Sequence, residues 1–321
     1  MERRIIGLPP GFRDLLLEDA ETNRRIENVF AGEFSSAGYH EILPSGVEFL
    51  DVYARGSRSA KDRCFKFFDR EDNLLALRAD FTPAVARIVV AHLHELPPPV
   101  RLWYSGSVFR RADMQRGQYH EFGQIGAELI GVNNVASDAE VLSLALRGLT
   151  GAGVADACVH VNHAGIFRGI VGRLGLDAEA QALVRSEIDR KDVRALGTRL
   201  EQLGIEEPAR EEVRILSKCV GGTDVLTTAL EAIRNPQSHS AILELSRLAA
   251  AVPQWSDRIV FDLTEIDEME YYSGCMFTFY SPSHTGELGK GGRYDGLLEE
   301  FGADLPAVGF SLSVDHIRES L

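Results

Sequence analysis

The spacing of apolar residues along the first part of the chain predicts a long amphipathic helix. Within residues 18–37, Ile26, Phe30 and Phe34 recur at helical spacing, and Gly38 follows where the pattern stops. A stripe of this kind must pack against another element to be buried. We therefore expect one long helix to open the fold.

Shorter runs after this helix predict strands. The run YHEILPSGVEF is interrupted by Pro44, which cannot donate a hydrogen bond to a sheet and so belongs at an edge or a bend. Residues 64–80 predict a hairpin with its turn at residues 70–73. Thr82 is then expected to cap the next helix, and Pro83 to start it.

A second long hairpin is predicted by RLWYSGSVFR and QYHEFGQIGAELIG. From residue 163 to 253 the chain changes to segments rich in Leu, Ala, Glu and Arg, which we interpret as a helical insertion within a core that spans residues 1–321. Strands return at DRIVFDL and EYYSGCMFTFY, and AVGFSLSVDHIRESL predicts a final strand and helix. We expect no appended C-terminal domain after that helix.

Composition and charge narrow the possible functions. The chain has 321 residues, 45% of them apolar, so it can bury a substantial core. Its 34 basic and 48 acidic side chains give a formal net charge of -14, which repels a polyanion. A broad nucleic-acid surface is therefore not expected. Neither a signal peptide nor an apolar run of about 20 residues is present, so the cytoplasm is the expected location and no membrane is involved.

Candidate metal, redox and phosphate sites are weak in the sequence. The four cysteines are widely separated: Cys64, Cys158, Cys219 and Cys275. They suggest neither a zinc site nor a disulfide framework. His160 and His163 lack a third ligand at a fitting spacing, so no metal is expected. The run GELGKGG lacks the hydroxyl residue and the helix of a phosphate loop, and we interpret it as a glycine-rich turn.

One strand of the second hairpin carries an unusual polar face. Alternate positions face opposite sides of a strand, which places Ile125, Ala127 and Leu129 on one side and Gln124, Gly126 and Glu128 on the other. The missing side chain at Gly126 leaves room for a small molecule, and Arg110 on the partner strand could supply positive charge. A solvated sheet face with incidental polar residues is the alternative. Asp80 likewise has a simple alternative role before a helix N-terminus.

Six segments, taken in order, resemble the signatures of the class II histidyl-tRNA synthetase core. They are GFRD, LRADFTPAVAR, VFRRADMQRGQYHEFGQIGAELIG, EIDEMEYYSG, GGRYDGL and AVGFSLSVDHI. The resemblance covers about the whole chain. It implies an α+β fold with a six-stranded antiparallel sheet flanked by helices, a helical insertion, and a homodimer formed through the Pro44 region.

Carried over to this chain, the resemblance implies a binding site for L-histidine. Its residues would be Asp80, Thr82, Arg110, Gln124, Glu128, Tyr271 and Tyr272. Glu128 and Tyr272 would hold the imidazole, whose two ring nitrogens need polar partners, and Tyr271 would form a wall.

The remaining residues of this implied site would hold the charged groups of the amino acid. Asp80, Thr82 and Gln124 would receive the ammonium group. Arg110, with Gln124, would face the carboxylate. A buried group left unpaired costs about 1 to 3 kcal/mol, which is enough to discriminate against other amino acids.

The chain departs from the synthetase pattern where ATP would be activated. Asp267 stands in place of an arginine that stabilises developing charge. The loop that normally brings a glutamate and two arginines to ATP offers Ala112, Asp113 and Gln118, and a further arginine corresponds to His316. Each lost donor of this kind is worth about 3 kcal/mol of transition-state stabilisation. We therefore expect neither catalysis nor a cofactor.

A retained amino-acid pocket without catalysis resembles the regulatory subunit of ATP phosphoribosyltransferase, in L-histidine biosynthesis. The resemblance implies a partner, the catalytic short-form subunit, in a hetero-octamer. This chain would activate that subunit and, by binding L-histidine, mediate its feedback inhibition. The alternative is a truncated synthetase-like enzyme that activates or transfers an amino acid to a non-tRNA acceptor. A third alternative is a tRNA-binding module, which the acidic balance disfavours. Exchange of pyrophosphate into ATP would distinguish the enzyme from the regulator.

Overall fold

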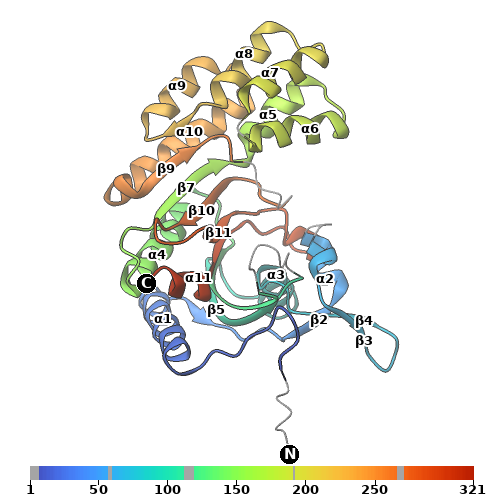
Figure 1. The fold of residues 1–321 in the computed structure, drawn as a ribbon, viewed down its shortest axis with the longest axis vertical. Coiled ribbons are helices and arrows are strands. Elements are labelled where there is room, and N and C mark those ends of the chain that lie inside the picture. Colours follow the sequence, from blue (N-terminus) through green and yellow to red (C-terminus); the bar gives the residue numbers. More distant parts are fainter. Residues whose placement is uncertain (1–6, 57–59, 112–118, 191, 266–270) are drawn as a thin grey trace, which may run out of the picture.

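Two sheets and a group of helices make up the protein (Figure 1). The computed structural model describes residues 7–56, 60–111, 119–190, 192–265 and 271–321. The main sheet has nine strands in the order β1-β5-β6-β12-β11-β10-β7-β9-β8. Their bounds are β1 His40–Glu41, β5 Val100–Phe109, β6 Glu121–Ile130, β7 Cys158–His163, β8 Val220–Gly221, β9 Ile259–Asp262, β10 Cys275–Tyr280, β11 Glu287–Arg293 and β12 Ala307–Ser313.

The centre of the main sheet is antiparallel, as the resemblance implies. Strands β5, β6, β12, β11, β10 and β7 pair antiparallel throughout. The sheet is wider than the six strands expected, because β1 joins β5 and β9 joins β7, both in parallel, and β8 adds to β9. The result is a mixed sheet with an antiparallel core, flanked by helices. The second long hairpin is confirmed as β5 and β6.

One face of this sheet is covered by helices through an apolar core. The helices are α1 Leu17–Ser36, α4 Val135–Ala152, α10 Pro236–Ala251 and α11 Val314–Glu319. The predicted first helix is confirmed, and Ile26, Phe30 and Phe34 are fully buried in this core. Helix α4 approaches α1 closely at Gly148, where an added Cβ would lie 2.1 Å from the Phe30 ring. The two helices therefore pack through a glycine and a phenylalanine.

The other face of the sheet meets helix α3 and a small second sheet. The helices here are α2 Leu50–Gly56, η1 Ala60–Arg63, α3 Thr82–Ile88, the π-helical turn η2 Val89–Leu93 and η5 Glu299–Phe301. The strands of the small sheet follow the order β2 Val47–Phe49, β4 Leu74–Leu77 and β3 Lys66–Phe68. The hairpin expected within residues 64–80 is confirmed as β3 and β4. The cap prediction is wrong, because Phe81 occupies the N-cap position and the Thr82 side chain bonds to a distant residue instead.

Between β7 and β9 the chain forms a lobe of helices, at the top of Figure 1. Besides α10 it contains α5 Ala164–Leu174, α6 Ala178–Asp189, α7 Val193–Gln202, α8 Glu207–Leu216 and α9 Asp224–Ala232, and η4 Pro253–Arg258 follows. Helix α5 ends at Gly175 in a left-handed conformation, and Asn235 caps α10 just before its proline. Gly175 thus ends one helix of the lobe, and Asn235 starts another.

The interpretation of GELGKGG as a turn is wrong. These residues lie largely in β11, which pairs with β10 on one side and β12 on the other. Glycine is needed there because an added Cβ at Gly289 would lie 2.1 Å from the Ser311 carbonyl oxygen, and one at Gly291 would lie 2.5 Å from the Gly309 carbonyl oxygen. Close approach of neighbouring backbones, rather than a turn, explains the glycines.

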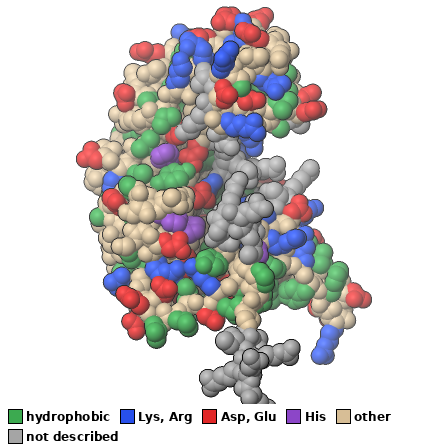
Figure 2. All heavy atoms as spheres, viewed as in Figure 1, with side chains coloured by type: hydrophobic (Ala, Val, Ile, Leu, Met, Phe, Trp, Pro, Cys, Tyr) green, Lys and Arg blue, Asp and Glu red, His purple; other side chains and the backbone are tan. Residues whose placement is uncertain are grey.

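The surface carries both signs of charge. On the face in Figure 2, acidic and basic groups alternate over the helical lobe and the sheet body, among the residues that are coloured there. Within the described residues, no helix combines the length and the apolar character that crossing a membrane requires.

Candidate functional site

A row of residues, polar except for one glycine, crosses the face of the main sheet opposite α1 and α4. Strand pairing places these residues side by side: Tyr104, Gly126, Ser311, Lys290, Thr278 and His160, from β5, β6, β12, β11, β10 and β7. The adjacent row contains Glu128 opposite Gly309. The polar face predicted for β6 is thus one part of a face that extends across six strands.

Glu128 lies at the centre of the candidate site and is almost fully buried. Its carboxylate accepts hydrogen bonds from three hydroxyls, Thr82 Oγ1 at 2.8 Å, Tyr104 Oη at 3.1 Å and Tyr294 Oη at 2.5 Å. Burial raises the pKa of the Glu128 carboxyl to about 7, although the three hydroxyls favour the charged form. The group can therefore exchange a proton with a bound partner near neutral pH.

The glycine opposite Glu128 makes this position possible. An added Cβ at Gly309 would lie only 1.5 Å from Glu128 Oε2. The carboxylate therefore occupies the space that a side chain at position 309 of β12 would fill. No other residue type at this position leaves that space for the carboxylate.

A small cavity opens beside Glu128. Five of the predicted residues line it: Asp80, Thr82, Glu128, Tyr271 and Tyr272. Tyr294 and Lys290 also line it, and sequence reasoning missed both as site residues. The volume is about 20 Å³, which holds about one water molecule. A larger ligand must therefore displace some of the lining side chains.

Arg110 and Asp80, predicted to bind opposite ends of the amino acid, pair with each other. Arg110 Nη2 lies 3.3 Å from Asp80 Oδ1, and Arg110 Nε donates to the Ala79 carbonyl oxygen at 2.6 Å. Asp80 Oδ1 also accepts from the backbone N–H of Phe81, directly before α3. Both interpretations of Asp80 therefore have support, since it caps the approach to a helix and lines the cavity.

Gln124 lies two residues from Gly126 on the same face of β6 and is buried. Its Nε2 donates to Ser311 Oγ at 2.9 Å, and Ser311 lines the cavity. Its Oε1 is buried and has no hydrogen-bond partner among the described residues. Because a buried unpaired acceptor costs about 1 to 3 kcal/mol, this oxygen favours a ligand that donates a hydrogen bond.

The space expected at Gly126 is not open. Tyr104 lies directly opposite on β5, and an added Cβ at Gly126 would be 2.6 Å from the Tyr104 hydroxyl. Tyr104 fills the space because its ring stacks on Phe81, with centroids 4.3 Å apart, and its hydroxyl reaches Glu128. A tyrosine opposite a glycine on the polar face is the signal that could have identified it.

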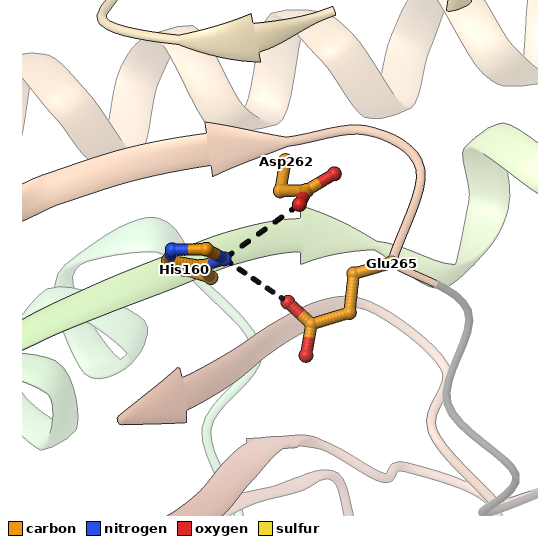
Figure 3. A group of neighbouring side chains, drawn as sticks. All are labelled: His160, Asp262 and Glu265. Carbon is orange, nitrogen blue, oxygen red and sulfur yellow. Dashed lines mark ion pairs between the residues drawn. The ribbon is translucent and has the colours of Figure 1, made fainter. Parts of the chain in front are cut away.

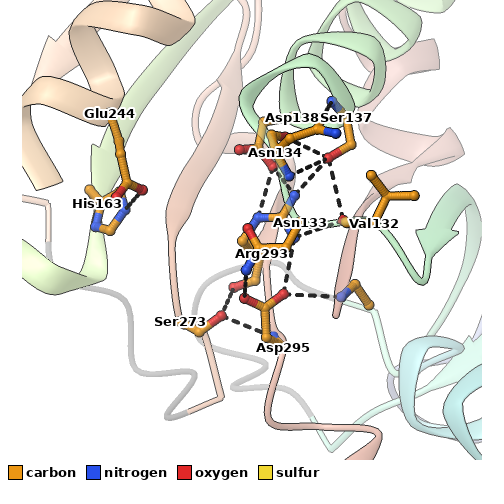
Figure 4. A network of polar contacts seen from close by, with 11 residues as sticks. Val132, Asn133, Asn134, Ser137, Asp138, His163, Glu244, Ser273, Arg293 and Asp295 are labelled. Carbon is orange, nitrogen blue, oxygen red and sulfur yellow. Dashed lines mark hydrogen bonds and ion pairs between the residues drawn. The ribbon is translucent and has the colours of Figure 1, made fainter. Parts of the chain in front are cut away.

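Arg293 and Asp295, which flank Tyr294 in the GGRYD segment, belong to a polar network that reaches the start of α4 (Figure 4). The buried Arg293 guanidinium contacts Asp138 at 2.5 Å and Asp295 at 3.0 Å, and donates to Ser137 Oγ at 2.8 Å. These contacts join the end of β11 to the start of α4 on both sides of Tyr294. The motif therefore positions the tyrosine that bonds Glu128.

The two tyrosines of the EYYSG segment stand at the wall of the cavity. The Tyr271 ring lies 5.0 Å from the Tyr272 ring and 6.0 Å from the Tyr294 ring, between centroids. Tyr272 is buried, and its carbonyl oxygen accepts from Arg168 of α5 at 2.6 Å. The first pair of rings is tilted and the second meets edge to face, and an aromatic wall of this kind can pack against a further planar ring.

Of the residues compared with the synthetase ATP site, His316 alone is described. Its Nδ1 lies 2.8 Å from the Glu287 carbonyl oxygen, and its ring stacks on His284 with centroids 4.7 Å apart. Burial, followed by the neighbouring His316, lowers the pKa of His284. The other departures, Ala112, Asp113, Gln118 and Asp267, lie outside the described residues.

Among the described residues, one group of three could hold a metal ion: His160, Asp262 and Glu265. The two carboxylates follow the helical lobe in the sequence, whereas His160 precedes it, so sequence spacing could not reveal them. Asp262 and Glu265 thus lie beside His160 in the fold, whereas His163 pairs with Glu244 at 3.1 Å.

Comparison with known proteins gives consistent matches along the chain. A family model described as histidyl-tRNA synthetase matches residues 11–317. The ATP phosphoribosyltransferase regulatory subunit of Moorella thermoacetica is 34% identical over 318 residues, 97% of this chain and 81% of that protein. That of Caldanaerobacter subterraneus is 35% identical over 320 residues, 99% of this chain and 83% of that protein.

A solved structure from Bacillus halodurans C, described as an ATP phosphoribosyltransferase regulatory subunit/histidyl-tRNA synthetase, has a TM-score of 0.92 and 28% identity, covering 99% of this chain and 83% of that one. Together with the antiparallel core, these matches define the class as histidyl-tRNA synthetase-like. Within that class, the chain belongs to the family of ATP phosphoribosyltransferase regulatory subunits.

Proposed function

We propose that this chain binds free L-histidine beside Glu128 and, through that binding, controls a catalytic short-form ATP phosphoribosyltransferase subunit in histidine biosynthesis. The observation that carries the proposal is a buried carboxylate, held by three hydroxyls, at the wall of a small aromatic cavity. An imidazole N–H is a donor that fits this acceptor. The regulatory role is proposed from the family, and the identity of the ligand is proposed from the chemistry of the site.

The charged groups around the cavity match an amino acid. Asp80 and the unpaired Gln124 Oε1 can accept from an ammonium group, and Arg110 can donate to a carboxylate. Without a ligand, Arg110 and Asp80 pair with each other. A bound amino acid would replace this ion pair with two, one to each residue. That exchange limits the cost of bringing a zwitterion into the site.

Regulation requires two states that bind the ligand with different affinity. A cavity of about 20 Å³ is far smaller than histidine, so binding must shift the lining side chains. Tyr271, which is only partly buried, and Arg110 are the candidates for that movement. Such a shift can carry a coupling free energy of about 1 to 3 kcal/mol to a partner subunit.

The proposed role is non-catalytic. His316 bonds to the backbone of β11 and stacks on His284, whereas an arginine at that position would offer a permanent positive charge. Asp267 carries the opposite charge to the arginine it replaces. Transition-state charge on a nucleotide phosphate would therefore lose donors worth about 3 kcal/mol each.

Assembly is the remaining part of the proposal. Six large apolar side chains are exposed around Pro44 and the small sheet: Leu43, Val47, Phe49, Phe67, Phe68 and Leu74. The strand register places Phe49 and Phe67 on one face of the small sheet and Phe68 on the other. Exposed apolar side chains gathered in one region are typical of an interface. We propose that this surface forms the homodimer, from which a hetero-octamer with the catalytic subunit is built.

Calorimetric titration of the protein with L-histidine tests the proposal. We expect binding without ATP, with a Kd in the micromolar range, about -7 to -8 kcal/mol. Glu128→Ala should weaken it by about 2 kcal/mol or more, because the imidazole loses its acceptor. Glu140→Ala is the matched control, since that carboxylate bonds Arg101 and Tyr39 on the apolar side of the sheet. Absence of heat and of thermal shift at millimolar histidine would exclude the site.

A further inference from the structure

A second polar cluster lies on the same face of the main sheet, at the base of the helical lobe (Figure 3). His160 comes from β7, Asp262 ends β9, and Glu265 follows shortly after it. His160 Nδ1 lies 3.6 Å from Asp262 Oδ2 and 3.7 Å from Glu265 Oε2. Both carboxylates thus point toward one ring nitrogen from different sides.

These distances suit a shared metal ion better than hydrogen bonds. Hydrogen bonds to nitrogen span about 2.7 to 3.2 Å, so both His160 contacts are too long. Ligands held at about 2.0 to 2.2 Å from a tetrahedral zinc ion are about 3.3 to 3.6 Å apart. One ligand atom from each of the three residues lies within 4.8 Å of the others. Small side-chain shifts would bring all three onto one ion.

The charges of the cluster also call for a cation. Asp262 is almost fully buried, and the Glu265 carboxylate lies on the same His160 nitrogen as a second acidic group. The backbone N–H and the hydroxyl of Thr264 donate to Asp262 Oδ1, which orients Oδ2 toward His160. The nearby Lys290 ammonium lies 3.3 Å from Glu287, so its single positive charge is shared with that carboxylate. A divalent ion would offset the two adjacent negative charges.

We propose that His160, Asp262 and Glu265 bind one divalent transition-metal ion, with zinc as the best fit to one imidazole and two carboxylates. The ion would link β7, which leads into the helical lobe, with the segment that follows β9. It would thereby hold the lobe against the sheet. Three protein ligands leave a further coordination position for water or a small anion. The proposal stands on its own and does not depend on histidine binding.

Zinc titration of the metal-stripped, full-length protein tests the proposal. We expect the wild-type chain to bind one more equivalent of zinc than His160→Ala and Glu265→Gln, or to bind it at least tenfold more tightly. Zinc should raise the Tm of the wild type and leave the Tm of both variants unchanged. His40→Ala, which removes an exposed histidine from β1, is the matched control and should behave as the wild type.

Cobalt gives the second measurement, because it distinguishes this site from the cysteines. Bound cobalt should show d–d absorption without a thiolate charge-transfer band, since the donors are nitrogen and oxygen. A thiolate band would place the metal at a cysteine and overturn the proposal. Absence of saturable binding, or binding that both variants retain at wild-type strength, would overturn it as well.

Discussion

The two faces of β6 are buried to the same extent but by different means. Leu129 and Glu128 are neighbours on this strand, each 1% exposed, and they face opposite sides of the sheet. Leu129 packs into the apolar core under α1 and α4, where contacts are numerous and not directional. Glu128 depends on three oriented hydroxyls. The extent of burial therefore does not distinguish a core residue from a site residue. The need for oriented hydrogen-bond partners distinguishes them.

The energetic consequences of the two faces are opposite. Burying a leucine side chain stabilises a protein by about 1.5 to 3 kcal/mol. Burying a carboxylate costs free energy that its hydrogen bonds offset only in part. Damage to the apolar face should therefore appear in stability. Damage to the polar face should appear in ligand binding and in pH dependence.

The largest effect is expected from Phe30→Ala on the apolar face. Phe30 is fully buried and its ring lies against Gly148 of α4, so truncation leaves a cavity between two helices. We expect a loss of about 3 to 5 kcal/mol in the free energy of unfolding, measured with urea. Arg25→Ala, an exposed position on the same helix, should change it by less than about 0.5 kcal/mol. Weaker histidine binding by folded Phe30→Ala protein would argue that the two faces are coupled.

The second-largest effect is expected in the pH dependence of stability, when the wild type is compared with Glu128→Gln. Burial raises the pKa of Glu128 from 4.5 to about 7, so the folded state holds this proton more tightly than the unfolded state. That stabilisation is fully present below pH 4.5 and is lost as the pH rises to 7. The wild type should therefore lose about 3 kcal/mol relative to Glu128→Gln across this window, measured by urea unfolding at several pH values. A constant difference between the two proteins would mean that Glu128 titrates in its usual range.

The smallest effects come from two glycines. Gly309→Ala brings a Cβ against the Glu128 carboxylate and the Ala127 carbonyl oxygen, so we expect a loss of about 1 to 3 kcal/mol in stability and histidine binding about tenfold weaker. Gly197→Ala, in α7 with nothing near its Cβ, should instead stabilise the protein by about 0.4 to 1 kcal/mol. Urea unfolding measures the stability of both variants, and calorimetric titration measures their histidine binding. Normal histidine binding by Gly309→Ala would show that the Glu128 carboxylate does not need the space beside Gly309.

Much of the fold could be predicted from local pattern. The first helix, both hairpins and the final strand and helix lie where periodicity places them. Two local interpretations failed for non-local reasons. Thr82 does not cap its helix because its hydroxyl donates a hydrogen bond to Glu128. The glycines of β11 do not form a turn because strands pair with β11 on both sides. In both cases a contact with a distant residue outweighed the local preference.

The sequence by itself determined which face of β6 is polar, because alternation along a strand is a property of consecutive residues. It also indicated Asp80, Thr82, Glu128, Tyr271 and Tyr272, which the structure brings to one cavity. Only the tertiary structure decided that Tyr104 fills the space at Gly126, and that two carboxylates approach His160. Those contacts depend on the register between strands that are far apart in the chain, and register is settled by the packing of the whole sheet.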